Sequence, residues 1–334
     1  MRLEELKRIL ADASQVFVLT DENVAMYWLP ELKHWLDCER AVEIVVKAGE
    51  RNKTLDTARL VWDALLKHGA DRHAVLVNLG GGMITDLGGF VASCYQRGIR
   101  FVNVPTTLLA MVDAAIGGKT GVDFEGCKNQ IGVFAEPVEV MISPVYLSTL
   151  PERDLYSGLA EMVKYGFIDD SDMLQVNECN YEQYLLRAGE IKKDLVERDF
   201  KEEGPRKVLN FGHTLGHALE SYTMNAADPL THGESVAMGM WCALWLSVKQ
   251  CGLDETVLDD YGPTLRMLLS LATTEFDAED VDGVLAYLAH DKKNLAGQTL
   301  FVLLEDIADP VWDQEVPESL VRQSLEALFA FLNQ

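Results

Sequence analysis

The segment at residues 77–90, VNLGGGMITDLGGF, decides the fold of the N-terminal half. It begins as an apolar run typical of a buried strand, continues with three consecutive glycines, and then becomes compatible with a helix. Glycines at such a turn let the backbone approach a pyrophosphate at the helix N-terminus. The segment lacks the GxGxxG fingerprint, so a tight turn without a ligand is an equal alternative. The segment therefore predicts a β–α unit and leaves nucleotide binding open.

The same alternation of strand and helix surrounds this segment. Short apolar runs predict strands at 16–20, 41–47, 74–80, 101–105 and 138–143, and apolar residues at helical spacing predict helices at 21–36 and 54–69. Strands that alternate with helices form a parallel sheet with helices on its faces. We therefore expect a Rossmann-like α/β domain over residues 1–150.

After about residue 150 the pattern changes to helices. Helical spacing of apolar residues recurs at 152–168, 184–200, 207–222, 232–248 and 319–334. No repeat, low-complexity tract or long linker marks a boundary, so the change of period alone places it. The prediction is an all-α domain over residues 151–334, with a small-molecule site in a cleft between the two domains.

Composition narrows the class of function. A formal net charge of −24 over 334 residues makes nucleic acid and anionic membrane surfaces poor partners. The apolar runs are too short to span a bilayer, and residues 1–10 predict an amphipathic helix instead of a signal peptide. The six cysteines are scattered without a CxxC pair, as in reduced cytoplasmic proteins. An anionic substrate would need a locally positive site in this acidic chain.

Two histidines, His213 and His217, stand four residues apart in the stretch NFGHTLGH at 210–217. On a helix they share one face, so both imidazoles could reach one zinc ion. The zinc-protease motif also has Glu directly after its first His, where this chain has Thr214. A metal site and a buried, hydrogen-bonded histidine pair therefore both remain open.

The stretch from 97 to 132 is unusually rich in polar residues and glycines for an otherwise apolar region. It contains GGKTG at 117–121 and KNQIG at 128–132, a composition that predicts functional loops on a rigid scaffold. Lys119 and Lys128 are candidates for contacts to phosphate or carboxylate. The alternative is a solvated loop, because surface lysines are common.

Six long motifs carry a resemblance to one enzyme family. They are GGGMITDLGGF at 80–90, RGIRFVNVPTTLLAMVDAAIGGKTGV at 97–122, KNQIGVF at 128–134, LPERDLYSGLAEMVKYG at 150–166, RKVLNFGHTLGHALE at 206–220 and HGESVAMGM at 232–240. Their order resembles that of the 3-dehydroquinate synthases, and the resemblance runs from about residue 18 to residue 294. It implies a Rossmann-like NAD-binding domain followed by an all-α metal-binding domain.

The resemblance also implies an activity. The family consists of carbon–oxygen lyases of the shikimate pathway, which leads to chorismate and the aromatic amino acids. They convert 3-deoxy-D-arabino-heptulosonate 7-phosphate to 3-dehydroquinate and phosphate. The steps are transient oxidation by NAD, β-elimination, re-reduction and intramolecular aldol closure. The implied cofactors are NAD and Zn²⁺, with Co²⁺ as the alternative metal, and the implied assembly is a homodimer.

The metal ligands implied by the resemblance are Glu161, His213 and His232. His217 then becomes a substrate-site residue near the phosphate, which changes the expectation drawn from the histidine pair alone. One carboxylate and two imidazoles leave coordination positions for substrate oxygens, as at a catalytic zinc. Taken singly, Glu161 is more typical of a solvated helix carboxylate, and His232 is more typical of a residue in the N-capping region of a helix.

The remaining site residues implied by the resemblance form two sets. The NAD contacts fall on Asp21, Asn23, Glu50, Lys53, Gly81, Gly82, Asp86, Thr106, Thr107 and Asp113. The substrate contacts fall on Lys119, Lys128, Asn129, Lys164, Lys192, Arg206, Asn210, His217, Lys292 and Lys293. Arg97 resembles an arginine that the family lends across the dimer to the neighbouring phosphate site.

Three other functions stay in view. A related cyclase could act on another heptulose or hexose phosphate, and a metal-dependent polyol or glycerol-phosphate dehydrogenase shares the expected architecture. A non-catalytic nucleotide-binding protein is the third alternative. The chain departs from the family pattern at several positions, among them Asp123, where Asn is common, and Cys127, where Gly is common.

Overall fold

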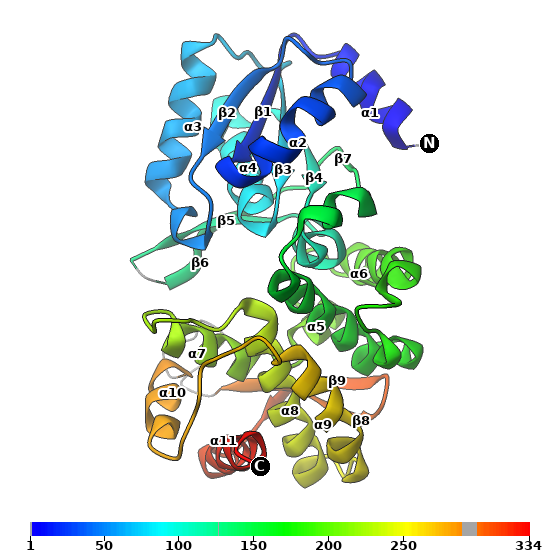
Figure 1. Ribbon diagram of the computed structural model, residues 1–334, viewed down its shortest axis with the longest axis vertical. Helices are drawn as coiled ribbons and strands as arrows, with labels where there is room; N and C mark the ends of the chain where they lie inside the picture. The colour runs from blue at the N-terminus through cyan, green and yellow to red at the C-terminus, as the bar shows by residue number, and fades with distance from the viewer. Residues whose placement is uncertain (1, 126, 289–298) are drawn as a thin grey trace. The chain divides into compact units, whose positions relative to one another are not determined.

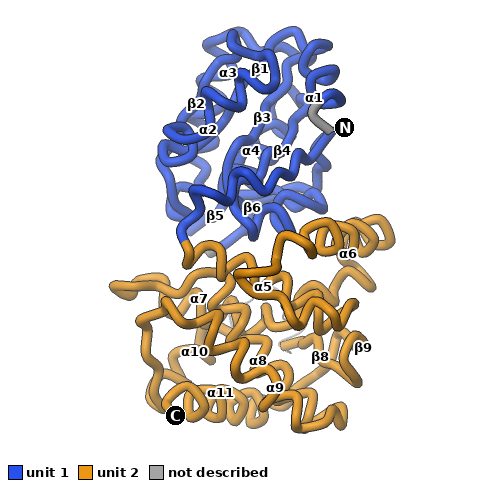
Figure 2. Tube along the Cα trace, turned by 45° about the vertical axis from the view of Figure 1, so that its right-hand side comes forward, with its two compact units in different colours: residues 1–151 blue, residues 152–334 orange. Residues whose placement is uncertain are grey.

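The computed structural model describes residues 2–125, 127–288 and 299–334 (Figure 1). The chain divides into two compact units, residues 1–151 (unit 1) and residues 152–334 (unit 2), coloured blue and orange in Figure 2. Within the described ranges, every helix is too short or too polar to cross a membrane.

Unit 1 is built on a parallel sheet with the strand order β2-β1-β3-β4-β7 (Figure 1). Its strands are β1 (Val16–Asp21), β2 (Val42–Val46), β3 (Val75–Gly80), β4 (Arg100–Pro105) and β7 (Glu139–Val140). All six residues of β3 are buried, as expected for a central strand of a parallel sheet. The predicted Rossmann-like α/β class is confirmed for this unit. The last predicted strand, 138–143, is shorter than expected, because only β7 pairs regularly with β4.

The helices of unit 1 follow the predicted alternation. They are α1 (Arg2–Ala11), α2 (Glu22–Trp35), α3 (Leu55–Lys67) and α4 (Gly82–Cys94). Helix α3 begins at Thr54, whose hydroxyl caps the first turn, and it buries Ala58, Val61 and Leu65 on one face. Its Trp62 donates an indole hydrogen bond to the carbonyl of Val91 on α4. These contacts complete an apolar core between the sheet and its helices.

Two buried asparagines connect the centre of this sheet to the segment that follows β4. Asn78 on β3 and Asn103 on β4 are paired in register, and the Asn78 amide donates to the Asn103 side chain at 2.9 Å. Asn103 in turn donates to the carbonyl of Ala115 at 3.1 Å. That carbonyl lies just after a π-helical turn, η3 (Ala110–Ala114). The two asparagines therefore attach the π-helical turn, which contains Asp113, to the sheet.

The predicted loops between 117 and 132 are strands, so that part of the prediction is wrong. β5 (Lys119–Phe124) and β6 (Cys127–Phe134) form an antiparallel hairpin. Gly121 faces Gly132 across it, and a Cβ on either residue would lie 2.8 Å or less from the opposite backbone. The glycines that suggested functional loops serve instead to let two strands approach closely.

Unit 2 is largely helical. Its helices are α5 (Glu152–Ile168), α6 (Leu185–Arg198), α7 (His213–Thr223), α8 (His232–Gln250), α9 (Thr256–Leu268), α10 (Asp280–Leu288) and α11 (Glu318–Leu332). Short 3₁₀ segments connect them: η5 (Ser171–Gln175), η6 (Tyr181–Tyr184) and η7 (Pro205–Asn210). The predicted single helix at 207–222 is interrupted, because Gly212 adopts a left-handed φ of 77° between η7 and α7.

An all-α unit 2 was expected, and the structure corrects this. β8 (Leu300–Asp306) and β9 (Asp309–Glu315) form an antiparallel hairpin. Residues 301–304 are buried, and the backbone N–H of Leu304 donates to Ser247 of α8 at 2.9 Å. Because both faces of β8 are covered, its apolar residues form a continuous run without the alternation that identifies a strand in sequence.

Helices α7 and α8 cross at glycines. A Cβ on Gly239 of α8 would lie 1.9 Å from the carbonyl oxygen of Gly212, and a Cβ on Gly212 would lie 2.8 Å from the backbone nitrogen of Met240. Both substitutions would therefore collide with backbone atoms. His213, the first residue of α7, lies beside α8, with its ring centroid 5.4 Å from that of His232.

Replacing Gly239 with Ala should destabilise unit 2 by about 1–3 kcal/mol, because the added methyl group forces the two helix backbones apart. Thermal and denaturant unfolding would measure the loss. Gly262→Ala on α9 is the matched control, since its Cβ would meet only the end of the Phe331 ring at 3.0 Å. Equal stability of the Gly239 variant and the wild type would contradict the close crossing.

Candidate active site

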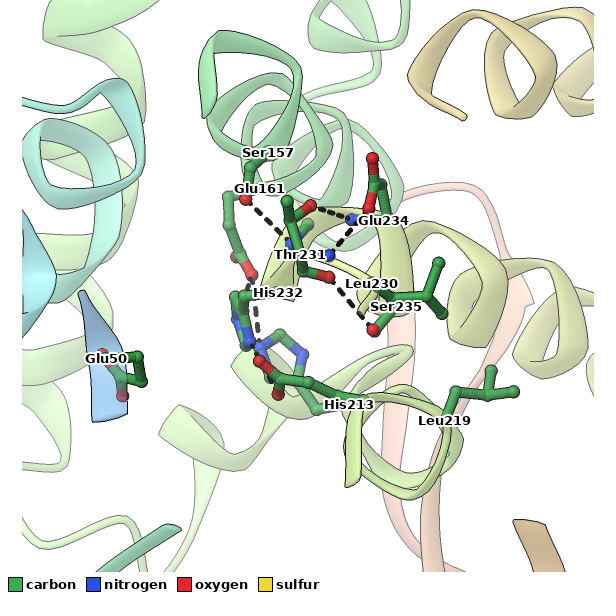
Figure 3. Close-up of polar contacts among 12 residues, drawn as sticks. Glu50, Ser157, Glu161, His213, Leu219, Leu230, Thr231, His232, Glu234 and Ser235 are labelled. Atoms are coloured by element: carbon green, nitrogen blue, oxygen red, sulfur yellow. Dashed lines mark hydrogen bonds and ion pairs between the residues drawn. The ribbon is translucent and has the colours of Figure 1, made fainter. Parts of the chain in front are cut away.

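Three helices of unit 2 bring Glu161, His213 and His232 together (Figure 3). Glu161 lies in the middle of α5, while His213 and His232 are the first residues of α7 and α8. The Oε1 atom of Glu161 lies 3.3 Å from the Nε2 atom of His213 and 3.3 Å from that of His232. Ligands at about 2.0 Å around a tetrahedral ion are roughly 3.3 Å apart, so these separations suit a zinc-sized cation.

Both imidazoles direct their Nε2 atoms at this point and use Nδ1 for a second contact. The Nδ1 atom of His213 donates to the carbonyl of Phe211 at 3.1 Å, since a carbonyl oxygen can only accept. The Nδ1 atom of His232 lies 3.5 Å from the Glu220 carboxylate. A metal-binding histidine ordinarily donates its second ring nitrogen to a carbonyl or a carboxylate, and both residues have that arrangement.

The Glu161 carboxylate is completely buried. Among the described residues, no donor makes a hydrogen bond to its Oε1 atom, although two imidazole nitrogens face it. Burial raises the pKa of Glu161, but the charges of Lys164 and His213 outweigh burial and hold the pKa well below its usual range. The group is therefore an ionised carboxylate whose Oε1 atom faces two imidazole nitrogens, a combination that a cation shared by the three side chains would satisfy.

The two histidines differ in their electrostatics. Burial lowers the pKa of His213, and this effect exceeds the opposing effect of Glu161. Burial also lowers the pKa of His232, but the carboxylates of Glu161 and Glu220 outweigh it and raise the pKa to about 10. His232 is thus the ligand on which a proton and a metal compete most directly.

Glu220 is a residue that sequence reasoning missed. Together with His217 and His232 it forms a second group of side chains within metal-ligating reach. The signal in the sequence was its spacing, because Glu220 stands three residues after His217 and seven after His213 on the same face of α7. His217 itself lies beside His213, with ring centroids 5.3 Å apart.

Unit 2 also holds buried cationic side chains at positions predicted for substrate binding. Lys164 on α5, Lys192 on α6 and Arg206 in η7 are each less than 9% exposed. Lys164 forms an ion pair with Glu161. The Arg206 guanidinium donates to the carbonyl of Phe200 at 2.6 Å. Buried cations are stable only when anions or acceptors surround them, so this group favours an anionic ligand.

Asn210 and Glu202 form part of the same region. The Asn210 amide donates to Glu202 at 2.6 Å, and Arg206 lies 4.0 Å from the same carboxylate. Glu202 adopts a left-handed φ of 61°, which is unusual for a residue with a side chain. Sequence reasoning missed Glu202, because nothing in the local pattern distinguishes it from the solvated acids around it.

In unit 1 the residues predicted for NAD gather at the carboxyl ends of the parallel strands. Asp21 ends β1 and accepts the N–H groups of Asn23 and Val24 at the start of α2. Glu50 and Lys53 follow β2, Gly81 and Gly82 with Asp86 follow β3, and Thr106 and Thr107 with Asp113 follow β4. This edge of an open α/β sheet is where nucleotides bind.

Lys53 has a more specific environment than the sequence suggested. It is 3% exposed and forms ion pairs with Glu50, with Asp86 at 3.5 Å and with Asp123 at 3.9 Å. Burial lowers the pKa of Lys53, but these carboxylates outweigh it and the pKa is raised. Asp123, one of the departures from the family pattern, thus takes part in a buried charge cluster.

The other predicted substrate residues of unit 1 lie on its surface. Lys119 begins β5 and is exposed. Lys128 and Asn129 lie on β6, where Asn129 has a φ of 52° and donates its N–H to Asp123 at 2.8 Å. Arg97 is exposed, with a φ of 69°. Lys292 and Lys293 lie outside the described residues.

Known families match both units. Residues 43–157 match the family described as 3-dehydroquinate synthase N-terminal, and residues 158–294 match 3-dehydroquinate synthase C-terminal. The chain belongs to the 3-dehydroquinate synthase family. The 3-dehydroquinate synthase of Parabacteroides distasonis is 39% identical over 93% of this chain and 90% of the relative. That of Acetivibrio thermocellus is 41% identical over 86% and 82%, respectively.

A solved structure with the same fold belongs to 2-epi-5-epi-valiolone synthase from Streptomyces hygroscopicus subsp. jinggangensis. It is 28% identical with a TM-score of 0.82, and the match covers 95% of this chain and 91% of that chain. That structure contains NAD⁺ and Zn²⁺. The TM-score and the coverage of both chains show that the two proteins share one fold.

Replacing Lys53 with Met should destabilise unit 1 more at about pH 8 than at about pH 5. Without the ammonium, the neighbouring carboxylates lose their counter-charge, and the pKa of Asp123, which burial already raises against the opposing charge of Lys53, rises further. A carboxylate with a raised folded-state pKa destabilises the fold above that pKa, and the effect disappears as falling pH protonates it. Urea midpoints across this range would test the prediction, with the exposed Lys67→Met as control. A loss of stability that is the same at every pH would contradict the role of Lys53 as the counter-charge of these carboxylates.

Proposed function

We propose that this chain converts 3-deoxy-D-arabino-heptulosonate 7-phosphate to 3-dehydroquinate and inorganic phosphate. The observation that carries the proposal is the meeting of Glu161, His213 and His232 in a chain of the 3-dehydroquinate synthase family. Formally the reaction is a phosphate elimination followed by carbocycle formation, catalysed by a carbon–oxygen lyase. The proposal places the enzyme in the shikimate pathway.

Glu161, His213 and His232 would hold a divalent metal, and Zn²⁺ is the proposed ion. The supporting observations are the 3.3 Å separations, the orphaned Oε1 atom of Glu161 and the second hydrogen bonds of both imidazoles. Zinc bound there would supply a Lewis acid for a substrate oxygen. Co²⁺ is the alternative, because it accepts the same nitrogen and oxygen ligands.

NAD is the proposed redox cofactor, and unit 1 would bind it at the carboxyl edge of its sheet. Gly81 and Gly82 at the N-terminus of α4 would face the pyrophosphate with backbone N–H groups. Asp21 and Glu50 would accept hydrogen bonds from ribose hydroxyls. NAD bound there would take up a hydride from the substrate and return it, so the overall reaction involves no net redox change.

The cationic residues would bind the two anionic ends of the substrate. In unit 2 this role falls to Lys164, Lys192, Arg206, Asn210 and His217, and in unit 1 to Lys119, Lys128 and Asn129. Burial strengthens the interaction of Lys164, Lys192 and Arg206 with an anion, because little water screens them. They would hold the substrate in one orientation, which lowers the entropic part of the barrier. A role for Lys292 and Lys293 stays a prediction.

A homodimer is the proposed assembly, with Arg97 reaching the phosphate site of the partner. The exposure of its side chain supports a role outside its own unit. The cytoplasm is the proposed compartment. Every cysteine whose side chain is described is a free thiol, as expected under reducing conditions.

A turnover assay tests the proposed reaction. Zinc-loaded protein would receive the heptulosonate phosphate and NAD⁺ at a concentration well below that of the substrate, while phosphate and nicotinamide absorbance are followed together. We expect many equivalents of phosphate per NAD⁺ and no lasting NADH. Accumulating NADH without phosphate would instead identify a dehydrogenase. No reaction with zinc bound, but phosphate release from a heptulose phosphate that lacks the carboxylate, would assign a related cyclase.

Replacing Glu161 with Gln should abolish turnover and weaken zinc binding by more than about 100-fold, the upper range for loss of an outer-shell partner. The amide keeps the shape of the side chain but removes the negative charge that faces the two imidazoles. Zinc content after dialysis and the zinc dissociation constant would be measured, with the exposed Glu190→Gln on α6 as control. Wild-type zinc affinity in the Glu161 variant would contradict the assignment.

A further inference from the structure

One face of α5 contacts the first turn of α8 at three successive levels. Arg153, Ser157 and Glu161 are spaced four residues apart, so they form a single stripe along α5. The residues opposite them are consecutive on α8. They pair as Arg153–Glu234, Ser157–Gly233 and Glu161–His232, which we call the α5–α8 ladder.

The outer level is a bidentate ion pair. The Nε and Nη2 atoms of Arg153 donate to the two carboxylate oxygens of Glu234 at 2.7 and 2.8 Å. Its Nη1 atom donates to Asp228 at 2.5 Å, and Nη2 also donates to the carbonyl of Pro229 at 3.1 Å. The guanidinium thus anchors the chain on both sides of the helix start, and its planar fork sets the direction of Glu234.

Glu234 transmits this anchoring to the backbone of α8. It is 1% exposed and stands at the third position of the helix, where its Oε2 atom accepts the backbone N–H of Thr231 at 2.7 Å. The Thr231 hydroxyl accepts the N–H of Glu234 in return. This capping box closes around His232, which is the first residue of α8. The conformation of His232 therefore depends on the carboxylate that Arg153 holds.

The middle level brings the two backbones into contact. The N–H of Gly233 donates to the Ser157 hydroxyl at 2.9 Å, and Figure 3 shows this bond between α5 and the start of α8. A Cβ on Gly233 would lie 2.2 Å from the carbonyl oxygen of Ser157. Only glycine permits this approach. The inner level, Glu161 and His232, lies one helical turn further along α5, with the 3.3 Å separation that suits a shared cation.

We propose that Arg153 and Glu234 are a positioning pair for the metal centre, acting through the α5–α8 ladder. Neither residue belongs to the Glu161, His213 and His232 group. Their ion pair sets the distance and angle between α5 and the start of α8, and so places the His232 imidazole against Glu161. The inference rests on the proposed function, because it requires that these side chains bind a metal.

Cobalt titration tests the pair, because the visible absorption of Co²⁺ reports both affinity and coordination geometry. We expect Arg153→Met and Glu234→Gln each to weaken Co²⁺ binding by about tenfold or more. The Co²⁺ affinity of Arg153→Lys should lie between the affinities of these two variants and that of the wild type, since lysine keeps the charge and loses the bidentate fork. The double variant should bind no more weakly than either single variant, because both remove one interaction.

Matched measurements separate positioning from general stability. Arg187→Met is the control, because Arg187 on α6 also pairs with two carboxylates, Asp169 and Asp170, but lies away from the ladder. Thermal unfolding without metal would be recorded for each protein. A changed absorption spectrum at saturating Co²⁺ in the Arg153 variants, with the control spectrum unchanged, would support the pair.

One result would overturn the positioning role alone, and a second would overturn the metal site on which that role rests. If the wild type binds Co²⁺ and Arg153→Lys, Arg153→Met and Glu234→Gln keep its affinity and spectrum, the ladder has only a structural role, whatever the unfolding temperatures. If the wild type itself binds no Co²⁺ or Zn²⁺, the proposed metal site fails and the ladder inference fails with it.

Discussion

The buried carboxylate of Glu161 is the constraint around which unit 2 is organised. An ionised group without water is stable only if positive charge or strong donors replace its hydration. Lys164 supplies one such charge from the next turn of α5, and two imidazoles face the remaining oxygen. This requirement constrains how α5, α7 and α8 pack, because α7 and α8 must begin, at His213 and His232, beside Glu161.

The charge distribution of the chain makes sense in the same terms. A net charge of −24 opposes the approach of any anion, so a sugar phosphate needs a local reversal of sign. In the proposed function, Lys164, Lys192 and Arg206 would provide that reversal from buried positions, where each charge acts through a low dielectric. In unit 1 the buried Lys53 is surrounded by three carboxylates.

The α/β class, the strand order along the chain and most helix positions follow from periodicity, because buried strands and amphipathic helices have distinct repeats. The glycines at 117–132 led to a wrong prediction of loops, since glycine occurs both in loops and in closely packed strands. The histidine pair was equally ambiguous. Four-residue spacing places His213 and His217 on one face, but His232 and Glu161 arrive from other helices, and no local pattern encodes that meeting. The family resemblance supplied this long-range information. Neither local patterns nor the resemblance identified Glu202 and Glu220.

The proposed function requires that Glu161, His213 and His232 bind one metal ion. Anomalous scattering at the zinc edge from crystals of the zinc-loaded protein would locate that ion. We predict one peak in this unit, within about 2.0–2.2 Å of a Glu161 oxygen and both Nε2 atoms. A peak between His217 and Glu220, or no peak at full zinc loading in solution, would contradict it.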